Sequence, residues 1–382
     1  MIFCFDIESA YATPNYGRTY TIDISNERLQ KNMNWEVQTE ALKGRATKRN
    51  SEFETVNGMV LAELTMQNPA WSYLTGCMLG QRNLISGYKF LEKSNCAWGM
   101  TIGYLDSAVA ADSTATMTIN EADLGDFNGV DAIVINNEFI TGNASNGSFV
   151  PTVRGAEGTT SRTHGEKDLV YGIVADLSRS IVITSRKRVG GFFEQTISLS
   201  AVVDRGSYQF GYSGLVLDSL SFNFRTYDVI DTTMEFKGAD STNNLGLADA
   251  LIYDANTIID LEDIKICSEH VEEHFRQFYI EYNNALQSVY GYNGKAQKHF
   301  LRRASTFGTL TWTEESYDHV LQYEANTKKN FSVSMSEGNY RMIFPFNDVR
   351  INTNSYYMDG ELLIQDSAPF YSFEDAVIMY QF

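Results

Sequence analysis

Alternation of apolar and polar residues with a period of two is the feature that most constrains how this chain can fold. It is clearest over residues 214–238. The apolar set is Val216, Leu220, Phe222, Phe224, Ile230, Met234 and Phe236, and the polar set is Ser219, Ser221, Asn223, Arg225, Asp231, Thr233 and Glu235. Successive side chains of a strand point to opposite faces. The stretch therefore predicts a long hairpin, turning at 226–228, with one dry face and one polar face.

Similar short runs separated by Gly, Asn, Asp and Ser recur along the chain and predict a mainly β fold. The expected strands are residues 180–184, 195–203, 274–283, 307–313, 331–335, 340–345 and 361–365. The first two are expected to pair with each other around a basic turn. Amphipathic helices are predicted at 58–66 and 316–328.

The chain of 382 residues is long enough for two domains or for one domain with insertions. Residues 106–165 are rich in small and polar residues and predict an inserted surface lobe or long loop, with weak strands such as 132–136. The two halves of the chain, with a boundary near 240–247, resemble each other faintly, which allows a duplicated domain. We therefore divide the chain into 1–245, which carries the insertion, and 246–382.

The charge balance argues against a protein that binds nucleic acid. Lys and Arg number 30 against 48 Asp and Glu, which gives a net charge of −18. Phosphate binding needs cations that replace counterions, although an acidic surface can equally serve solubility. The four cysteines predict free buried thiols of a reducing cytoplasm. The start has no secretory signal, no apolar run reaches the length of a membrane span, and no membrane partner is expected.

One segment matches a metal motif literally. His270, Glu273 and His274 fit the H-x-x-E-H zinc pattern, which works only on a helix. Here the segment continues into an alternating strand, where residues i and i+4 lie about 13 Å apart. The acidic stretch 121–131 departs from the spacing of a calcium loop. We therefore expect no metal and no cofactor.

The remaining histidines, His164, His299 and His319, show no constellation with Ser or Asp along the sequence. A Ser-His-Asp triad is formed by spatial neighbours, so a hydrolase with a scattered active site stays an alternative. No nucleophile elbow, Walker loop or dinucleotide fingerprint is present. The expectation is that the protein is not an enzyme.

Two basic clusters stand out in this acidic chain. They are Lys43, Arg45, Lys48 and Arg49, and Arg186, Lys187 and Arg188. Such clusters can be interface patches that meet acidic surfaces of a neighbouring subunit. Ordinary solvated turns are the other interpretation.

Three segments, in this order along the chain, resemble bacteriophage tail tube proteins (major tail proteins). Residues 208–238 are similar to that family's central hairpin, with an aromatic-Gly entry and a strand ending in Phe-x-Gly. Residues 278–294 are similar to a strand with an Asn-Asn step and a Gly-rich continuation. Residues 307–312, 342–345 and 358–363 are similar to the closing strands, and 53–68 fit a helix before a strand.

The resemblance implies a β-sandwich or partial barrel with a flanking α-helix. Subunits would join their sheets into rings around a channel, and the rings would stack through loops and an N-terminal arm at 1–20. Two fused tube-like halves would give trimeric rings, and one tube domain would give hexamers. The implied partners are copies of itself, the tape-measure protein and tail terminator or tip proteins. The implied location is the virion tail, after synthesis in the host cytoplasm.

A channel that passes genomic DNA without specific binding should present small polar and acidic groups. The polar face of the central hairpin is therefore the expected lining, and Arg225 departs from an acidic lining. The lining residues would be Ser219, Ser221, Asn223, Asp231 and Glu235. The alternative function is a carbohydrate- or receptor-binding β-sandwich of a virion tip or cell surface, because aromatic residues make up 13% of the chain and can stack on sugars.

Overall fold

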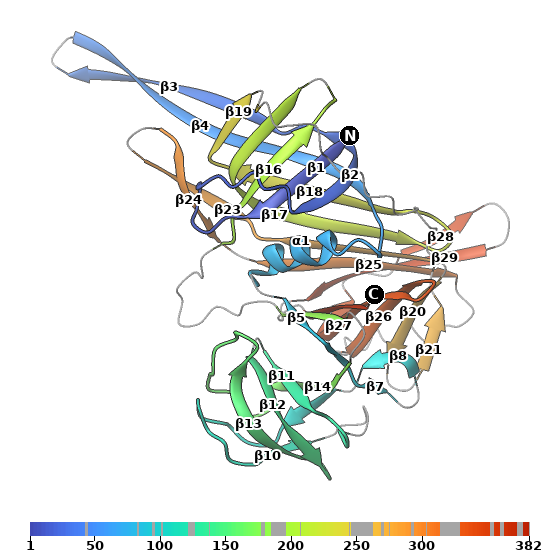
Figure 1. The fold of residues 1–382 in the computed structure, drawn as a ribbon. Coiled ribbons are helices and arrows are strands. Elements are labelled where there is room, and N and C mark those ends of the chain that lie inside the picture. The colour runs from blue at the N-terminus through green and yellow to red at the C-terminus, as the bar shows by residue number, and fades with distance from the viewer. Residues whose placement is uncertain are drawn as a thin grey trace.

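The computed structural model is mainly β, with one α-helix in the part of the chain that it describes (Figure 1). The described residues are 1–42, 45–81, 84–93, 96–100, 102–120, 127–136, 138–176, 180–184, 196–206, 208–243, 245, 263–268, 271–274, 276–291, 294–302, 304–313, 329–351, 355–359, 363–372 and 377–381. The predicted fold class, a mainly β protein, is confirmed.

A central antiparallel sheet forms the spine of the molecule. Its order is β3 (Gln30–Leu42), β4 (Arg45–Leu64), β18 (Ile230–Gly238), β17 (Gln209–Arg225), β22 (Gln277–Asn283), β25 (Ser305–Thr313), β29 (Leu363–Ser372) and β28 (Ser355–Asp359). The predicted hairpin is β17–β18, with Asn223 opposite Asp231. The β3–β4 hairpin projects away from the body (Figure 1).

Two smaller sheets extend from this spine. One contains β1 (Ile2–Ile7), β2 (Tyr20–Glu27), β16 (Leu199–Asp204), the first part of β17 and β19 (Asp240–Asn243). The other contains β20 (Asp263–Ser268), β21 (Val271–His274), β26 (Lys329–Glu337), β27 (Tyr340–Ile351), β30 (Val377–Gln381), β15 (Ile181–Thr184) and β5 (Ile85–Ser86). Two hairpins remain, β7 (Glu92–Lys93) with β8 (Cys96–Met100) and β23 (Leu286–Tyr290) with β24 (Ala296–Leu301).

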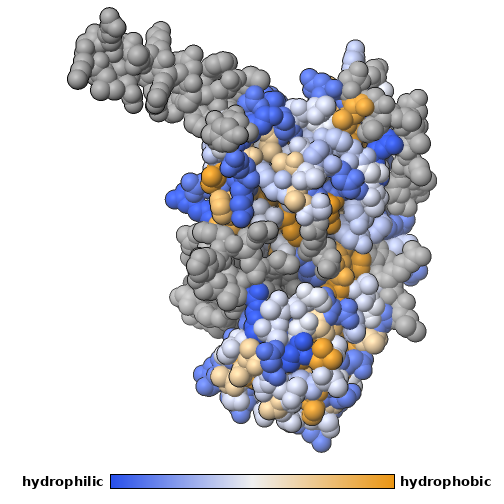
Figure 2. All heavy atoms as spheres, turned by 60° about the vertical axis from the view of Figure 1, so that its left-hand side comes forward, coloured by the Kyte–Doolittle hydropathy of each residue, from blue (hydrophilic) through white to orange (hydrophobic). Residues whose placement is uncertain are grey.

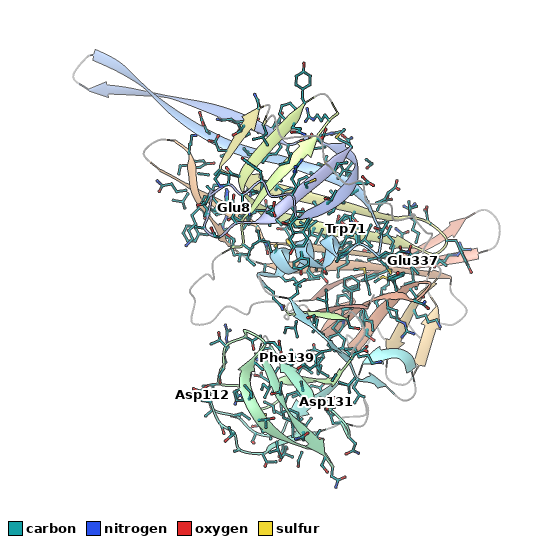
Figure 3. All side chains as sticks on the ribbon, viewed as in Figure 1. Glu8, Trp71, Asp112, Asp131, Phe139 and Glu337 are labelled. Carbon is teal, nitrogen blue, oxygen red and sulfur yellow. The ribbon has the colours of Figure 1, made fainter. Side chains whose placement is uncertain are left out.

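One hydrophobic core lies between the central sheet and the two smaller sheets. The dry face of the central hairpin contributes Phe222 and Phe224, both fully buried. Phe224 stacks on Phe278 of β22, with ring centroids 5.7 Å apart. The helix α1 (Ala70–Leu79) flanks this core and buries Trp71 in it (Figure 3). The alternation in the sequence thus identified the buried face of β17 and β18 correctly.

Several strand pairings outside the inserted lobe occur twice, with the same registers. Val216 lies opposite Lys237 and Leu217 opposite Phe236; 134 residues further along, Arg350 lies opposite Tyr371 and Ile351 opposite Phe370 (350 − 216 and 371 − 237). Both pairings then slip by one residue, to Ser219 opposite Glu235 and to Ser355 opposite Ser367.

A second bulge is repeated as well. Leu199 pairs with Leu215 and, after a register shift, Ala201 with Tyr212; Lys329 pairs with Val349 and, after the same shift, Phe331 with Phe346. In the first half of each repeat, β1 corresponds to β20, β2 to β21, β3 to β22 with β23, and β4 to β24 with β25. In the second half, β16 corresponds to β26, β17 to β27 with β28, β18 to β29, and β19 to β30. The pairing of β17 with β22 joins the two repeats. The chain is therefore duplicated.

The first repeat carries an insertion that folds as a closed six-stranded barrel. Its strands, in order around the barrel, are β9 (Ile102–Leu105), β10 (Met117–Asn120), β13 (Ser148–Ala156), β12 (Glu138–Ser145), β11 (Ala132–Ile135) and β14 (Leu169–Ala175), which returns to β9. The short β6 (Tyr88–Phe90) also pairs with β14. The insertion is thus wider than the expected 106–165, and its strands are paired all around.

The barrel has its own apolar interior, which includes Leu105, Ile119 and Phe149. Its outer surface packs on the body through a second cluster, which contains Phe139 of the barrel and Ile343 of β27. On the face shown in Figure 2, apolar side chains lie singly or in small groups among polar ones. Within the described part of the chain, no helix is long and apolar enough to cross a membrane.

Two sequence predictions about local structure are wrong, and a third cannot be compared with the structure. Residues 58–64 continue β4 instead of forming a helix, because Val60, Ala62 and Leu64 bury one face with a period of two. The expected helix 316–328 lies outside the described residues. Strands β15 and β16 do not pair with each other; β15 pairs with β30 and β5, and β16 with β1 and β17.

The N-terminal segment is not a free arm. Phe3 and Phe5 of β1 are fully buried between β2 and β16. The following loop is tied down by two buried carboxylates: Asp6 accepts hydrogen bonds from Thr19 N (3.2 Å) and its hydroxyl, and Glu8 accepts one from Ala12 N (2.8 Å). Cys4 and Cys77 are buried, as predicted, and the side chains of Cys96 and Cys267 lie outside the described set.

Candidate functional site: the open face of the central sheet

The side of the central sheet that points away from the core is the candidate site, and we call it the open face. On each strand, its residues alternate with the buried residues whose side chains point into the core. They are Met59, Leu61 and Glu63 on β4; Asp231, Thr233 and Glu235 on β18; Ser219, Ser221 and Asn223 on β17; Tyr279 and Glu281 on β22; and Phe307 and Thr309 on β25. All five side chains predicted to line a channel therefore lie together on this face.

The register arranges these side chains in rows across the strands. One row runs from Glu63 through Asp231, Asn223 and Tyr279 to Thr309. Another row brings Ser221 beside Glu281. The sequence analysis did not single out Glu63 and Glu281, because their place on this face depends on which strands are neighbours.

Among the side chains that the structure describes, the open face carries four carboxylates, and none of them has a bound cation. Asp231 and Glu235 are exposed, and Glu63 and Glu281 are half-buried. No ion pair joins any of the four to a Lys or Arg whose side chain is described. Glu63 and Asp231 are direct cross-strand neighbours, and like charges in that position destabilise a sheet.

Lys237 and Arg225, which share the parity of the open face, have partners other than these four carboxylates. Lys237 lies 2.7 Å from Asp218 and donates a second hydrogen bond to the carbonyl of Leu286. Arg225, the residue that departed from an acidic lining, lies 3.8 Å from Asp228, and both side chains are about half exposed. An exposed pair at this distance is weak, but it draws the guanidinium toward the β17–β18 turn.

The middle of the open face is held by hydrogen bonds between side chains. Gln277 donates to Asn223 at 2.7 Å, and the Tyr279 hydroxyl donates to Glu281 at 3.0 Å. Burial raises the pKa of Tyr279, and the hydrogen bond to Glu281 raises it further. Tyr279 also packs edge-on against Phe307, at 6.2 Å between ring centroids. These contacts fix the polar groups and keep Tyr279 neutral, so its hydroxyl adds no charge to the face.

The predicted basic patches are only partly within the described residues. Arg45, Lys48 and Arg49 lie on the backbone of β4 near the tip of the projecting β3–β4 hairpin, with Arg49 opposite Gln38. Lys43, Arg186, Lys187 and Arg188 lie outside the described set. The first patch is therefore placed at the end of an arm, and the second has no described position.

His164 is a structural residue of the barrel. It is 1% exposed, and its Nε2 lies 2.7 Å from Glu138. Glu138 also receives Arg154 Nε at 2.7 Å and two main-chain N–H groups, from Gly155 and Arg162. No described Ser or Cys hydroxyl or thiol is hydrogen-bonded to the imidazole. No sequence pattern marks this network, because Arg154 and Glu138 lie 10 and 26 residues before His164 (164 − 154 and 164 − 138).

His299 is buried on β24, at 1% exposure. Its Nδ1 lies 3.0 Å from Ser288 Oγ, and its Nε2 has no hydrogen-bond partner among the described residues. Burial lowers the pKa of His299 to about 4, and the nearby Lys237 adds to that shift. The ring is therefore neutral near pH 7. His319 lies outside the described residues.

The metal motif falls where the sequence analysis expected it. Val271–His274 is strand β21, and His270 is outside the described part of the chain. Of the acidic stretch, residues 121–126 are also outside it. No group of three or more His, Cys, Asp or Glu that could hold a metal occurs among the described residues.

No protein-family model matches the chain, and no curated protein matches its sequence. The open face, the duplication and the barrel are therefore the features from which a function has to be argued.

Proposed function

We propose that this protein is a structural subunit that assembles with copies of itself into stacked rings around a channel, as the resemblance to phage tail tube proteins implies. The single observation that carries the proposal is the open face. A strand-built surface whose described side chains include four carboxylates, with no described cation bound to them, suits a wall along which a polyanion must slide. In this role genomic DNA and a tape-measure protein would pass without specific binding.

The repulsion between Glu63 and Asp231 supports the same role. A soluble protein gains little from like charges placed directly opposite on neighbouring strands. A channel gains a uniformly negative wall. The polar residues Ser219, Ser221 and Asn223 would complete a lining in which the four carboxylates outnumber the cations Lys237 and Arg225. Terminator and tip proteins of a virion tail are the other partners that this role implies.

Duplication suits ring assembly as well. Each repeat contributes four strands to the central sheet, and the sheet has an unpaired edge at each end among the described residues. Exposed edges are a hazard in a monomer and are removed when a sheet closes. Two repeats per subunit favour the trimeric form of the expected ring. The basic arm tip of β4 would then meet an acidic surface of a neighbouring copy.

The test is negative-stain electron microscopy of the purified protein and of virions that contain it. Hollow cylinders of uniform diameter are expected. A protein that stays monomeric at all concentrations and gives a positive hit in a glycan screen would overturn the proposal in favour of a carbohydrate-binding module.

The lining is tested separately in the assembled cylinders. The double variant Asp231→Lys, Glu235→Lys should retain short DNA fragments in a salt-dependent manner, whereas wild-type cylinders should not. Asp106→Lys with Glu166→Lys is the matched control, because both residues are exposed on the barrel. Equal DNA retention by the two double variants would contradict the assignment of the open face to the lumen.

A further inference from the structure

We infer that β28 of one copy pairs antiparallel with the segment 26–30 of the next copy, at the end of β2 and the start of β3. The inference rests on the proposed ring assembly and names the contact that closes it. Its basis is the duplication within the chain. The two strands that join the repeats inside one subunit each have a counterpart in the other repeat, and these counterparts are the edge strands at the two ends of the central sheet.

The internal contact is the pairing of β17 with β22, in which Ser221 lies opposite Glu281 and Arg225 opposite Gln277. In the second repeat the counterpart of β17 is β28. In the first repeat the counterpart of β22 is the segment that includes the end of β2 and the start of β3. Among the described residues β28 pairs only with β29, and residues 26–30 pair only with β4.

The registers fix which residues would meet. Ser355 is the counterpart of Ser221, since each opposes the same position of β29 and β18 (Ser355 with Ser367, and Ser221 with Thr233). Gln30 is the counterpart of Glu281, since Gln30 opposes Asn57 and Glu281 opposes Phe307, each one residue before Gly58 or Gly308. The inter-subunit register therefore places Ser355 opposite Gln30 and Asp359 opposite Asn26.

At the edge formed by residues 26–30, side chains of the same chain bind the main-chain groups that face outward. Leu29 N donates to Glu27 Oε1 at 2.6 Å, and Glu27 N donates to the side chain of Asn26 at 2.8 Å. The Leu29 carbonyl accepts the Tyr212 hydroxyl at 3.2 Å. The counterparts of Glu27 and Leu29 in the second repeat are Phe278 and Ile280, which face β17. Side chains of the free subunit thus bond the main-chain groups that a neighbouring strand would take, which is how edges are protected.

Repeating the same contact between copies continues the sheet in one direction. Each copy then adds eight strands, in the order β3, β4, β18, β17, β22, β25, β29 and β28. The open face stays on one side, because the counterpart residues have the same parity in both repeats. A head-to-tail contact of this kind generates a ring when its rotation closes.

The test uses a disulfide between the two predicted neighbours, Gln30→Cys with Ser355→Cys. Within one chain these positions are at opposite edges of the sheet, seven strand spacings or roughly 30 Å apart, so an intrachain bond is excluded. Under mild oxidation the double variant should give a ladder of covalent oligomers that ends at the copy number of the ring. The register control is Gln30→Cys with Tyr357→Cys, which is two residues out on the same strand.

The matched pair should cross-link at least about tenfold faster than the register control, because only directly opposed residues meet the narrow Cβ separation of a disulfide. The two single-cysteine variants should remain uncoupled. Cylinders that form while the matched pair fails to cross-link would overturn the edge pairing and leave ring assembly standing. A chain that forms neither cylinders nor cross-links would overturn both proposals.

Discussion

Replacing Glu138 by Gln tests whether one buried carboxylate organises the barrel. Glu138 is fully buried on β12, and its two oxygens receive Arg154, His164 and the main-chain N–H groups of Gly155 and Arg162. Glutamine keeps the volume, but it removes the charge and turns one acceptor into a donor. Arg154, whose side chain is 4% exposed, would then be a buried cation without its counter-charge.

The magnitude follows from the pKa. Burial alone would raise the pKa of Glu138, but hydrogen bonds from Arg154 and His164 hold it at about 2, against an ordinary value of 4.5. A difference of this size corresponds to about 3 kcal/mol at neutral pH. Glu138 takes up a proton at lower pH in the folded state than in the unfolded state. Its contribution to the free energy of unfolding is therefore fully present above pH 4.5 and is lost as pH falls toward 2.

The assay is urea unfolding at pH 7 and at pH 3, with hydrogen exchange of barrel peptides as the local readout. At pH 7 the variant should lose about 3 kcal/mol, and the loss should be smaller at pH 3. Glu166→Gln is the control, because Glu166 is exposed on a neighbouring loop. A loss under about 1 kcal/mol, or a loss that does not change with pH, would refute the reasoning.

Three further predictions follow from the body of the molecule. His299 is neutral when folded and its pKa is about 4, below the ordinary 6.5; stability should therefore fall by up to about 3 kcal/mol as pH drops from 6.5 to 4, and urea unfolding of His299→Phe should lack this slope. In Gly308→Ala a Cβ would lie 2.2 Å from Phe370 Cζ, so a loss of about 1–3 kcal/mol is expected in thermal unfolding, and an unchanged midpoint would contradict it. Asp231→Asn removes the repulsion with Glu63 and should raise the urea midpoint of the unassembled chain slightly; a lower midpoint would show that the two carboxylates do not oppose folding.

The sequence alone was sufficient for features that depend on neighbours along the chain. The period-two alternation identified the mainly β fold, the β17–β18 hairpin and its buried face, because side-chain parity follows directly from strand geometry. It also put the five expected lining residues on one side. The same local signal failed at 58–64, where Val60 and Leu64 fit a helical spacing as well as a strand. Burial of Ala62 between them decided for a strand.

Only the tertiary structure decided which strands are neighbours. The duplication is visible in the registers but scarcely in the residues: Val216 and Lys237 in one repeat correspond to Arg350 and Tyr371 in the other. Main-chain hydrogen bonds tolerate such replacements, so the pairing persists where the residue types have diverged. The carboxylates of the open face come from strands far apart in sequence. The same holds for the strands that close the barrel and for the residues that bind Glu138. Their contacts depend on the packing of the whole chain, which a local pattern does not encode.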